Sequence, residues 1–585
     1  MLEQLAVTSV EPYEDLPYGD LSYEWVTATA GFAVDPDRPA NARVTDLGLA
    51  PRDTDGLVRF DADVRLLRPT TGGNGRALLS VPNRGMTMGL PFNSVPDPQF
   101  GLGRYPAAMD GFLLHRGWTM AWCGWQWDVP RTPTSLGLTA PVADVQPGWL
   151  RVEFRPDADQ ADHALSDSNP LVAFTDYPTA DVADPQAVLT VRTSPMGPEH
   201  TVPRSQWRFT SETRFEVDGG FRAFHWYSLR YRTTYAPVVG AGLLALRDFG
   251  ASLRESHGHV FATGISQSGR MLRQLLYEGM NLDESDTQVF DGVFAQVASA
   301  RRGEFNQRYG QPALLHPLTP AYGAPLDTTS LLGRQRAAGG VPKTVLVNSA
   351  YEYWRGDGAL VHQHPHTGDD LPEDPDARAY LISGTDHLGP VEFLKKPMPL
   401  ANPPHLLDPS LVTRALFVQL EEWVCDGREP EPSQVPRRAD GTAVTREEVL
   451  TSFPGAALPD PEHLTHTPLI DPDSTWPLRT GEPLVALVSA VDENGNERAG
   501  IRLPEVATGV AAYTGWNPRA HVDDLPDVLY EMPGSRLPAQ GAGARPTPSA
   551  IRAAAQDLAT RRFLLPQDVD QAVEQGLGEL ADQPV

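Results

Sequence analysis

A serine flanked by small residues carries the strongest chemical signal in this chain. Ser266 lies within Gly264–Arg270, where Gly264 and Ser268 complete the pattern small-x-Ser-x-small. A serine nucleophile on a sharp strand-to-helix turn needs small residues two positions before and after it, because the strained turn brings backbone segments close together. The pattern alone is common. Here the strand-like run His259–Thr263 precedes it and helical spacing follows it, which is the context that a catalytic serine requires.

A nucleophilic serine also needs a base and an acid that orients the base. In hydrolases built on a parallel α/β sheet these follow in the order serine, acid, histidine. Glu352 comes after the apolar run Thr344–Asn348, and His387 comes after Arg378–Ser383. Both positions fall just beyond strand ends, where open α/β sheets build their active sites. We predict a triad of Ser266, Glu352 and His387. The acids left as alternatives are Asp357, Asp386 and, more weakly, Asp291.

Acyl transfer passes through an oxyanion that backbone amides must stabilise. The amide of Gln267 follows the serine at the positive end of a helix and is the first predicted donor. The second is expected in the loop after the early strand Ala77–Pro82, from the amide of Arg84 or Gly85. Gly85 could instead serve only to form a turn.

Three tryptophans, Trp122, Trp125 and Trp127, cluster near the end of another apolar run. Aromatic residues at this spacing more often belong to the core. We expect that of Trp122 and Trp125, and keep Trp127 as a candidate for lining the substrate pocket.

A histidine-rich stretch contains His362, His364 and His366. Such stretches sometimes bind metal. Pro365 and the neighbouring Gly and Asp residues favour a flexible loop, and the carboxylate–histidine spacing of a zinc site does not occur. Phosphate-loop and dinucleotide-binding fingerprints are also missing from the sequence. We therefore predict neither a metal site nor a cofactor.

The elements that position these residues alternate between strand-like and helix-like segments. Buried strands are predicted at Asp61–Leu67, Ala77–Pro82, Thr119–Trp125, His259–Thr263, Phe290–Val297, Thr344–Asn348 and Arg378–Ser383. Helices are predicted at Tyr105–Arg116, Val238–Arg254, Met271–Gly279 and Leu411–Cys425. This alternation predicts a mostly parallel central sheet with helices on both faces, the α/β-hydrolase fold.

Three parts are expected along the chain. Residues 1–59 are predicted to be a β-rich segment of short strands and loops packed on the core. Residues 60–425 form the catalytic domain, with a long insertion rich in Pro, Asp and Thr at 128–217. Residues 426–585 form an extension with a strand near Leu484–Val491 and helices at Ser549–Phe563 and Pro566–Leu580, packed on the catalytic domain.

Composition bounds the classes of function. The 585 residues carry 75 acidic and 48 basic side chains, a net charge of -27. Such a surface argues against nucleic acid and anionic membranes as partners, and against a highly anionic substrate without a local basic pocket. Cys123 and Cys425 are too far apart in sequence to form a redox or metal motif. Neither a secretory leader nor a bilayer-length apolar run is recognisable, so a cytoplasmic protein is expected if the chain begins at its natural start.

The sequence also resembles a known family. Gly264–Arg270 followed by Phe290–Val293 is similar to bacterial alpha/beta hydrolase domain-containing proteins. Further matching pieces are Asn83–Gly85, Gly124–Gln126, Glu352–Trp354, Gly384–His387 and Tyr513–Trp516, with Phe32–Pro36 and Leu49–Arg52 near the start. The resemblance implies serine esterase-like activity with Ser266, Glu352 and His387 at the matching positions. Val361–His366 departs from the family in being richer in histidine.

The expected function is therefore hydrolysis of a small-molecule carboxylic ester through an acyl-enzyme. An acyltransferase or amidase could use the same triad. An alternative of another class is a non-catalytic binding protein that keeps the hydrolase fold. The sequence gives no prediction of oligomeric state.

Overall fold

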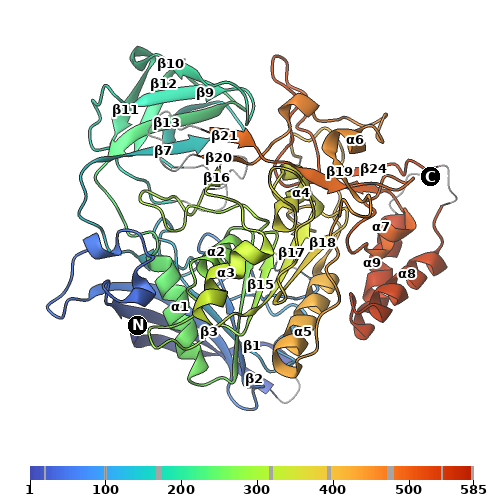
Figure 1. Cartoon of the computed structure of the whole chain (residues 1–585), viewed down its shortest axis with the longest axis horizontal. Coiled ribbons are helices and arrows are strands. Elements are labelled where there is room, and N and C mark those ends of the chain that lie inside the picture. The colour runs from blue at the N-terminus through green and yellow to red at the C-terminus, as the bar shows by residue number, and fades with distance from the viewer. Residues whose placement is uncertain are drawn as a thin grey trace.

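The computed structural model describes residues 1–18, 21–95, 97, 99, 102–166, 174–314, 321–391, 397–470, 480–541 and 545–581. Its centre is a 10-stranded sheet (Figure 1). The strand order is β1 (Leu2–Tyr18), β2 (Leu21–Val34), β3 (Val58–Pro69), β5 (Thr119–Cys123), β4 (Arg76–Ser80), β14 (His259–Ile265), β15 (Gly292–Gln296), β17 (Lys343–Ser349) and β18 (Ala377–Ile382), with β6 (Leu138–Thr139) beside β3.

Every strand pair from β5 to β18 is parallel, as predicted for the centre of the sheet. The pairs among β1, β2, β3 and β5 are antiparallel. Parallel strands bring their carboxyl ends to one edge. The segments that follow β4, β14, β17 and β18 therefore meet at that edge, and these segments hold the predicted site residues.

Helices cover both faces of the sheet (Figure 1). On one face lie α1 (Ala241–Arg254), α2 (Gln267–Tyr277) and α3 (Thr328–Ala338), and on the other lies α5 (Ser410–Asp426). Successive strand residues point to opposite faces, which divides the core in two. In β14, Ala262 packs in the cluster with the α1 and α2 side chains, whereas Phe261 packs in the cluster with Phe417 of α5.

Two segments differ from the expectations from sequence. The first part of the chain is a long hairpin of β1 and β2 rather than short strands. The segment Tyr105–Arg116, predicted as a helix, contains turns and no helix among its residues. Met109 and Gly111 have φ of 52° and 57°, and a right-handed helix cannot pass through such positions.

The insertion forms a separate β layer, which lies apart from the main sheet in Figure 1. One of its sheets contains β7 (Gly148–Phe154), β9 (Val188–Arg192), β10 (His200–Val202) and β13 (Trp226–Thr233). The other contains β8 (Gln160–Ala164), β11 (Trp207–Ser211) and β12 (Arg214–Phe221). The layer thus continues through β13, past residue 217.

The remaining elements lie mostly in the C-terminal extension, and all but the last two helices are short. They are β16 (Ala321–Tyr322), α4 (Ala350–Arg355), β19 (Ala443–Thr445), α6 (Arg446–Leu450), β20 (Pro468–Ile470), β21 (Thr480–Pro483), β22 (Leu487–Ser489), α7 (Pro504–Thr508), β23 (Ala512–Thr514), β24 (Ser535–Leu537), α8 (Pro548–Thr560) and α9 (Val569–Ala581).

The extension is joined to the central sheet by backbone and side-chain contacts. The Ile501 amide donates to the Leu381 carbonyl in β18 at 2.7 Å. Arg414 of α5 pairs with Asp568, Nε to Oδ2, at 2.6 Å. The division into three parts remains a prediction. Among the described residues, no helix has the length and apolar character to cross a bilayer.

Candidate active site

Ser266 occupies a strained turn between β14 and α2. Its backbone has φ 57° and ψ -114°, a conformation that places the side chain at the carboxyl edge of the sheet. A Cβ added to Gly264 would lie 2.6 Å from the carbonyl carbon of Ser268, so the turn requires glycine there. At the other flank Ser268 is tolerated, because its Oγ accepts from the Ile265 amide at 2.9 Å and donates to the Ile265 carbonyl at 3.0 Å.

The three residues predicted as a triad lie in one hydrogen-bonded chain. Ser266 Oγ is 2.8 Å from Nε2 of His387. Nδ1 of His387 is 2.5 Å from Oε1 of Glu352. Ser266 is half-buried, whereas Glu352 is fully buried. The arrangement can move a proton from the serine hydroxyl to the imidazole while the carboxylate holds the ring.

The position of Glu352 is set by the start of α4. Its second carboxylate oxygen, Oε2, accepts from the Ser349 amide at 2.9 Å and the Ser349 hydroxyl at 2.6 Å, which closes a capping box. Burial favours a higher pKa for Glu352. The charge and hydrogen bond of His387, with Arg355 and Ser349, outweigh burial and lower that pKa. Glu352 is thereby kept as the anion.

The loop that carries His387 is held from both sides. Asp386 accepts from the amides of Leu388 at 2.9 Å and Gly389 at 2.8 Å. The Gly534 amide donates to the same carboxylate at 3.3 Å, and the His387 amide donates to the Met532 carbonyl at 3.2 Å. The C-terminal extension therefore fixes the loop of the histidine.

The alternative acids have other partners. Asp386 binds the amides of its own loop and of Gly534, as described. Asp357 pairs with Arg355, Oδ1 to Nε, at 2.7 Å. Asp291 accepts from the Val260 amide at 2.9 Å near the start of β14, at the opposite end of that strand from Ser266.

The predicted oxyanion loop, Asn83–Gly85, is hydrogen-bonded to the turn that carries Ser266. Asn83 Nδ2 donates to the Ile265 carbonyl at 2.8 Å. The Arg84 amide donates to Oε1 of Gln267 at 3.1 Å, so this predicted donor is engaged within the protein. Gly85 has φ 82°, and a Cβ there would lie 2.5 Å from Val129 Cγ1. The Gln267 amide begins α2 and has no acceptor within the helix.

The tryptophans expected in the core are buried, and Trp127 is 7% exposed. Its Nε1 donates to the Gly310 carbonyl at 3.3 Å, and its ring lies 4.5 Å from that of Tyr177. Tyr177 donates to the same carbonyl at 2.8 Å. Trp127 thus joins the insertion to the segment around Gly310, and its role in a substrate pocket stays a prediction.

The three histidines of the histidine-rich stretch do not share a centre. His362 is buried against Tyr353, Nε2 to Oη, at 3.0 Å, and burial lowers its pKa to about 3. His366 is exposed, and its amide donates to Nδ1 of His364 at 3.3 Å. No group of three His, Cys, Asp or Glu residues that could hold a metal occurs in the described ranges.

Some residues around Ser266, His387 and Glu352 were not predicted from sequence. The ring of Tyr351 packs edge-on against that of His387, with 5.7 Å between centroids. A Cβ on Gly515 would lie 2.4 Å from the carbonyl carbon of Ala350, so this glycine permits the extension to contact the start of α4. In the sequence, Gly515 was marked only by the Tyr513–Trp516 motif, which is one of the pieces that resemble the family.

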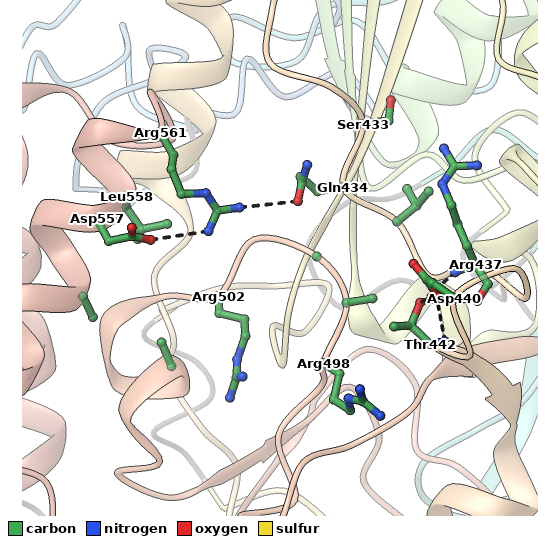
Figure 2. A pocket seen from close by; sticks show the side chains of 15 residues that line it. Ser433, Gln434, Arg437, Asp440, Thr442, Arg498, Arg502, Asp557, Leu558 and Arg561 are labelled. Carbon is green, nitrogen blue, oxygen red and sulfur yellow. Dashed lines mark hydrogen bonds and ion pairs between the residues drawn. The ribbon is translucent and has the colours of Figure 1, made fainter.

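A cavity of about 450 Å³ lies in the C-terminal extension (Figure 2). Its lining is charged, and the labelled side chains that carry the charge are Arg437, Arg498, Arg502, Arg561, Asp440 and Asp557. The lining includes no predicted site residue. The hydrogen-bonded chain at Ser266 is therefore the candidate active site.

Residues 186–574 match the family described as Alpha/beta hydrolase domain. This match and the parallel sheet confirm the predicted α/β-hydrolase fold and the resemblance seen in the sequence. A search of curated proteins gave no significant match.

Solved structures similar to this chain include esterases. A CE15 glucuronoyl esterase from Teredinibacter turnerae T7901 is 10% identical with a TM-score of 0.23, and the match covers 59% of this chain but only 61% of that one. A glucuronoyl esterase from Solibacter usitatus is 11% identical with a TM-score of 0.25, over 65% of this chain and 82% of that one. Brefeldin A esterase, a bacterial homologue of human hormone sensitive lipase, is 9% identical with a TM-score of 0.18, over 55% and 60%.

Proposed function

The chain belongs to the Alpha/beta hydrolase domain family, and on that premise we propose that it hydrolyses a carboxylic ester with Ser266 as its nucleophile. The observation that carries the proposal is the unbroken chain from Ser266 Oγ through His387 to Glu352, at 2.8 Å and 2.5 Å. Nucleophile, base and orienting acid within hydrogen-bond distance are the arrangement that activates a serine hydroxyl.

In the first half of the reaction, His387 Nε2 takes the proton of Ser266 Oγ as that oxygen attacks the ester carbonyl. The imidazolium then donates this proton to the departing alcohol, which leaves an acyl group on Ser266. In the second half, His387 takes a proton from water as the water oxygen attacks the acyl carbonyl. The bond from the acyl carbon to Ser266 Oγ then breaks, the acid leaves, and the imidazolium returns its proton to Ser266 Oγ. Glu352 stabilises the imidazolium throughout, and its lowered pKa supports that role.

The oxyanion is held by backbone amides in this proposal. Gln267 provides one, because its amide opens α2 next to Ser266. From the loop after β4 we propose Gly85 as the second donor. The Arg84 amide is bonded to the Gln267 side chain, so Arg84 serves as a donor only if that bond opens.

The test is hydrolysis of p-nitrophenyl esters from acetate to dodecanoate by wild type and by Ser266→Ala. We expect activity in wild type, a loss to background in Ser266→Ala and unchanged folding by circular dichroism. The preferred acyl length then measures the acyl pocket. Full activity in Ser266→Ala would refute the proposal.

The alternatives from the sequence have their own readouts. Faster product release with an added alcohol, together with a new ester product, would identify an acyltransferase, and cleavage of p-nitroanilides would identify an amidase. Failure of a serine-directed phosphonate to label Ser266 in the folded protein would favour the non-catalytic binding protein.

A further inference from the structure

A second charged group lies one helical turn beyond the nucleophile. Ser266 is the residue that precedes α2, and the Arg270 amide in the first turn of the helix donates to the Ser266 carbonyl at 2.9 Å. Long helical side chains extend toward the helix N-terminus, which here is the end that carries Ser266. Arg270 is only 8% exposed. A guanidinium is thus enclosed beside the nucleophile.

Arg270 has no counter-ion among the described residues. Its Nε is enclosed without a hydrogen-bond partner. Burial, together with the charges of Arg355, Arg301 and Arg84, lowers its pKa, and Asp357 only partly opposes this effect. These neighbours follow β4, β15 and β17, so the guanidinium lies at the carboxyl edge of the sheet, where the proposed reaction takes place.

Two of the neighbouring arginines are already satisfied. The guanidinium of Arg84 donates to the carbonyls of Ala313 at 3.0 Å and Leu314 at 2.8 Å. Arg355 holds Asp357 through two hydrogen bonds, at 2.7 Å and 2.8 Å. The carboxylate of Asp357 is therefore committed to Arg355, and the Nε of Arg270 is left without a hydrogen-bond partner among the described residues.

An enclosed charge without a partner is unfavourable for folding, because its hydration is lost and nothing replaces it. The cost is tolerated where a ligand supplies the opposite charge. A single free guanidinium presents parallel N–H donors that match one carboxylate. The protein as a whole has a net charge of -27, so a local excess of arginine is needed for it to attract an anion.

Resting on the proposed ester hydrolysis, we propose that Arg270 binds a carboxylate of the substrate. The substrate class is then an ester that bears a second, free carboxylate, either a monoester of a dicarboxylic acid or an ester of a hydroxy acid. The carboxylate pairs with Arg270 while the ester carbonyl lies at Ser266.

The experiment compares esters that differ in one charge. Mono-p-nitrophenyl glutarate against its methyl ester tests a carboxylate on the acyl side, and 3-acetoxybenzoate against methyl 3-acetoxybenzoate tests the alcohol side. We expect wild type to prefer the charged member of one pair by about ten- to one-hundredfold in kcat/KM, the range for hydrogen bonds to a charged group. In Arg270→Gln the ratio of kcat/KM between the charged and the neutral ester falls to about one, and Arg270→Lys regains part of the preference.

Two variants serve as matched controls. Arg273 is a buried arginine on the same helix, and it donates to the Leu326 carbonyl. Arg498 is exposed in the C-terminal cavity, so Arg498→Gln removes one charge from the protein surface only. Arg273→Gln and Arg498→Gln keep the charge preference if the inference is correct.

Several outcomes would overturn the inference while leaving the ester hydrolase intact. They are equal rates for charged and neutral esters in wild type, a preference retained by Arg270→Gln, and an equal loss in Arg273→Gln. If no ester is cleaved, the proposed function fails, and the site is tested by calorimetric titration of Ser266→Ala with monomethyl glutarate. Binding that disappears in Ser266→Ala/Arg270→Gln supports the carboxylate site, and its absence from Ser266→Ala overturns it.

Discussion

The side-chain oxygen Oε1 of Gln267 lies 3.1 Å from the backbone nitrogen of Arg84 and joins the helix that follows Ser266, the proposed nucleophile, to the loop that follows β4. The amide end of the same side chain donates to the Pro312 carbonyl at 2.6 Å. Gln267 is fully buried. One residue therefore positions two of the segments from which oxyanion donors are expected.

Replacing Gln267 by Met is expected to lower kcat about tenfold with little change in KM. The substitution removes the side chain that positions the Asn83–Gly85 loop, whereas the backbone N–H of residue 267 remains as an oxyanion donor. Steady-state kinetics on the best p-nitrophenyl ester measure the effect. The matched control is Gln363→Met, because Gln363 is also buried and donates to a proline carbonyl, that of Pro436. Equal effects of the two substitutions would mean that Gln267 has no special part in the reaction.

Among the carboxylates near His387, Glu352 is expected to matter most for kcat. Glu352→Gln should lower kcat by about 10³- to 10⁴-fold, because an amide favours the wrong tautomer of His387. Asp357→Asn and Asp386→Asn should cost less, since these residues bind Arg355 and loop amides. Parallel measurements of kcat rank the three variants. If Asp386→Asn is the most damaging, the assignment of the acid is wrong.

Gly515→Ala is expected to lower both stability and activity. The new Cβ would lie 2.4 Å from the Ala350 carbonyl carbon and 2.6 Å from the Tyr351 amide nitrogen, so the start of the helix that carries Glu352 must move. Thermal unfolding and ester hydrolysis measure the two effects. In Gly578→Ala, the control, the Cβ meets nothing within 4 Å, and the midpoint should stay or rise slightly. Wild-type behaviour of Gly515→Ala would contradict this packing.

Glu497 should make stability depend on pH. It accepts from the Gly384 amide at 2.8 Å beneath the loop of His387, and burial raises its pKa to about 7 from 4.5. The folded state thus prefers the neutral acid, so the free energy of unfolding is highest below the unfolded pKa and falls as pH rises toward 7, by at most about 3 kcal/mol.

The measurement is the thermal midpoint of Glu497→Gln and wild type at pH 5 and pH 8. The thermal midpoint of Glu497→Gln relative to that of wild type should be higher at pH 8 than at pH 5, because the glutamine side chain does not ionise. Glu493→Gln, an exposed position on the same segment, should show no such gain. A constant difference between Glu497→Gln and wild type would refute the role of Glu497.

Much of the sheet was predictable because buried parallel strands are continuous apolar runs. The expected strand His259–Thr263 became β14, and Arg378–Ser383 became β18 with a one-residue shift. The helix expected at Tyr105–Arg116 did not form, because positive φ at Met109 is a tertiary feature that helical spacing does not reveal. The long β1–β2 hairpin was missed since frequent Pro, Asp and Gly residues suggested breaks.

The sequence by itself determined the fold class and proposed Ser266, Glu352 and His387, since strand periodicity and the order of motifs are local properties of a chain. Only the tertiary structure decided that these three side chains meet, that Arg84 bonds Gln267, and that Arg270 is enclosed with no counter-ion among the residues that the structure describes. The packing of strands and loops decides how close two distant segments of the chain lie and whether a charge is buried. Residue types and their spacing alone do not reveal either.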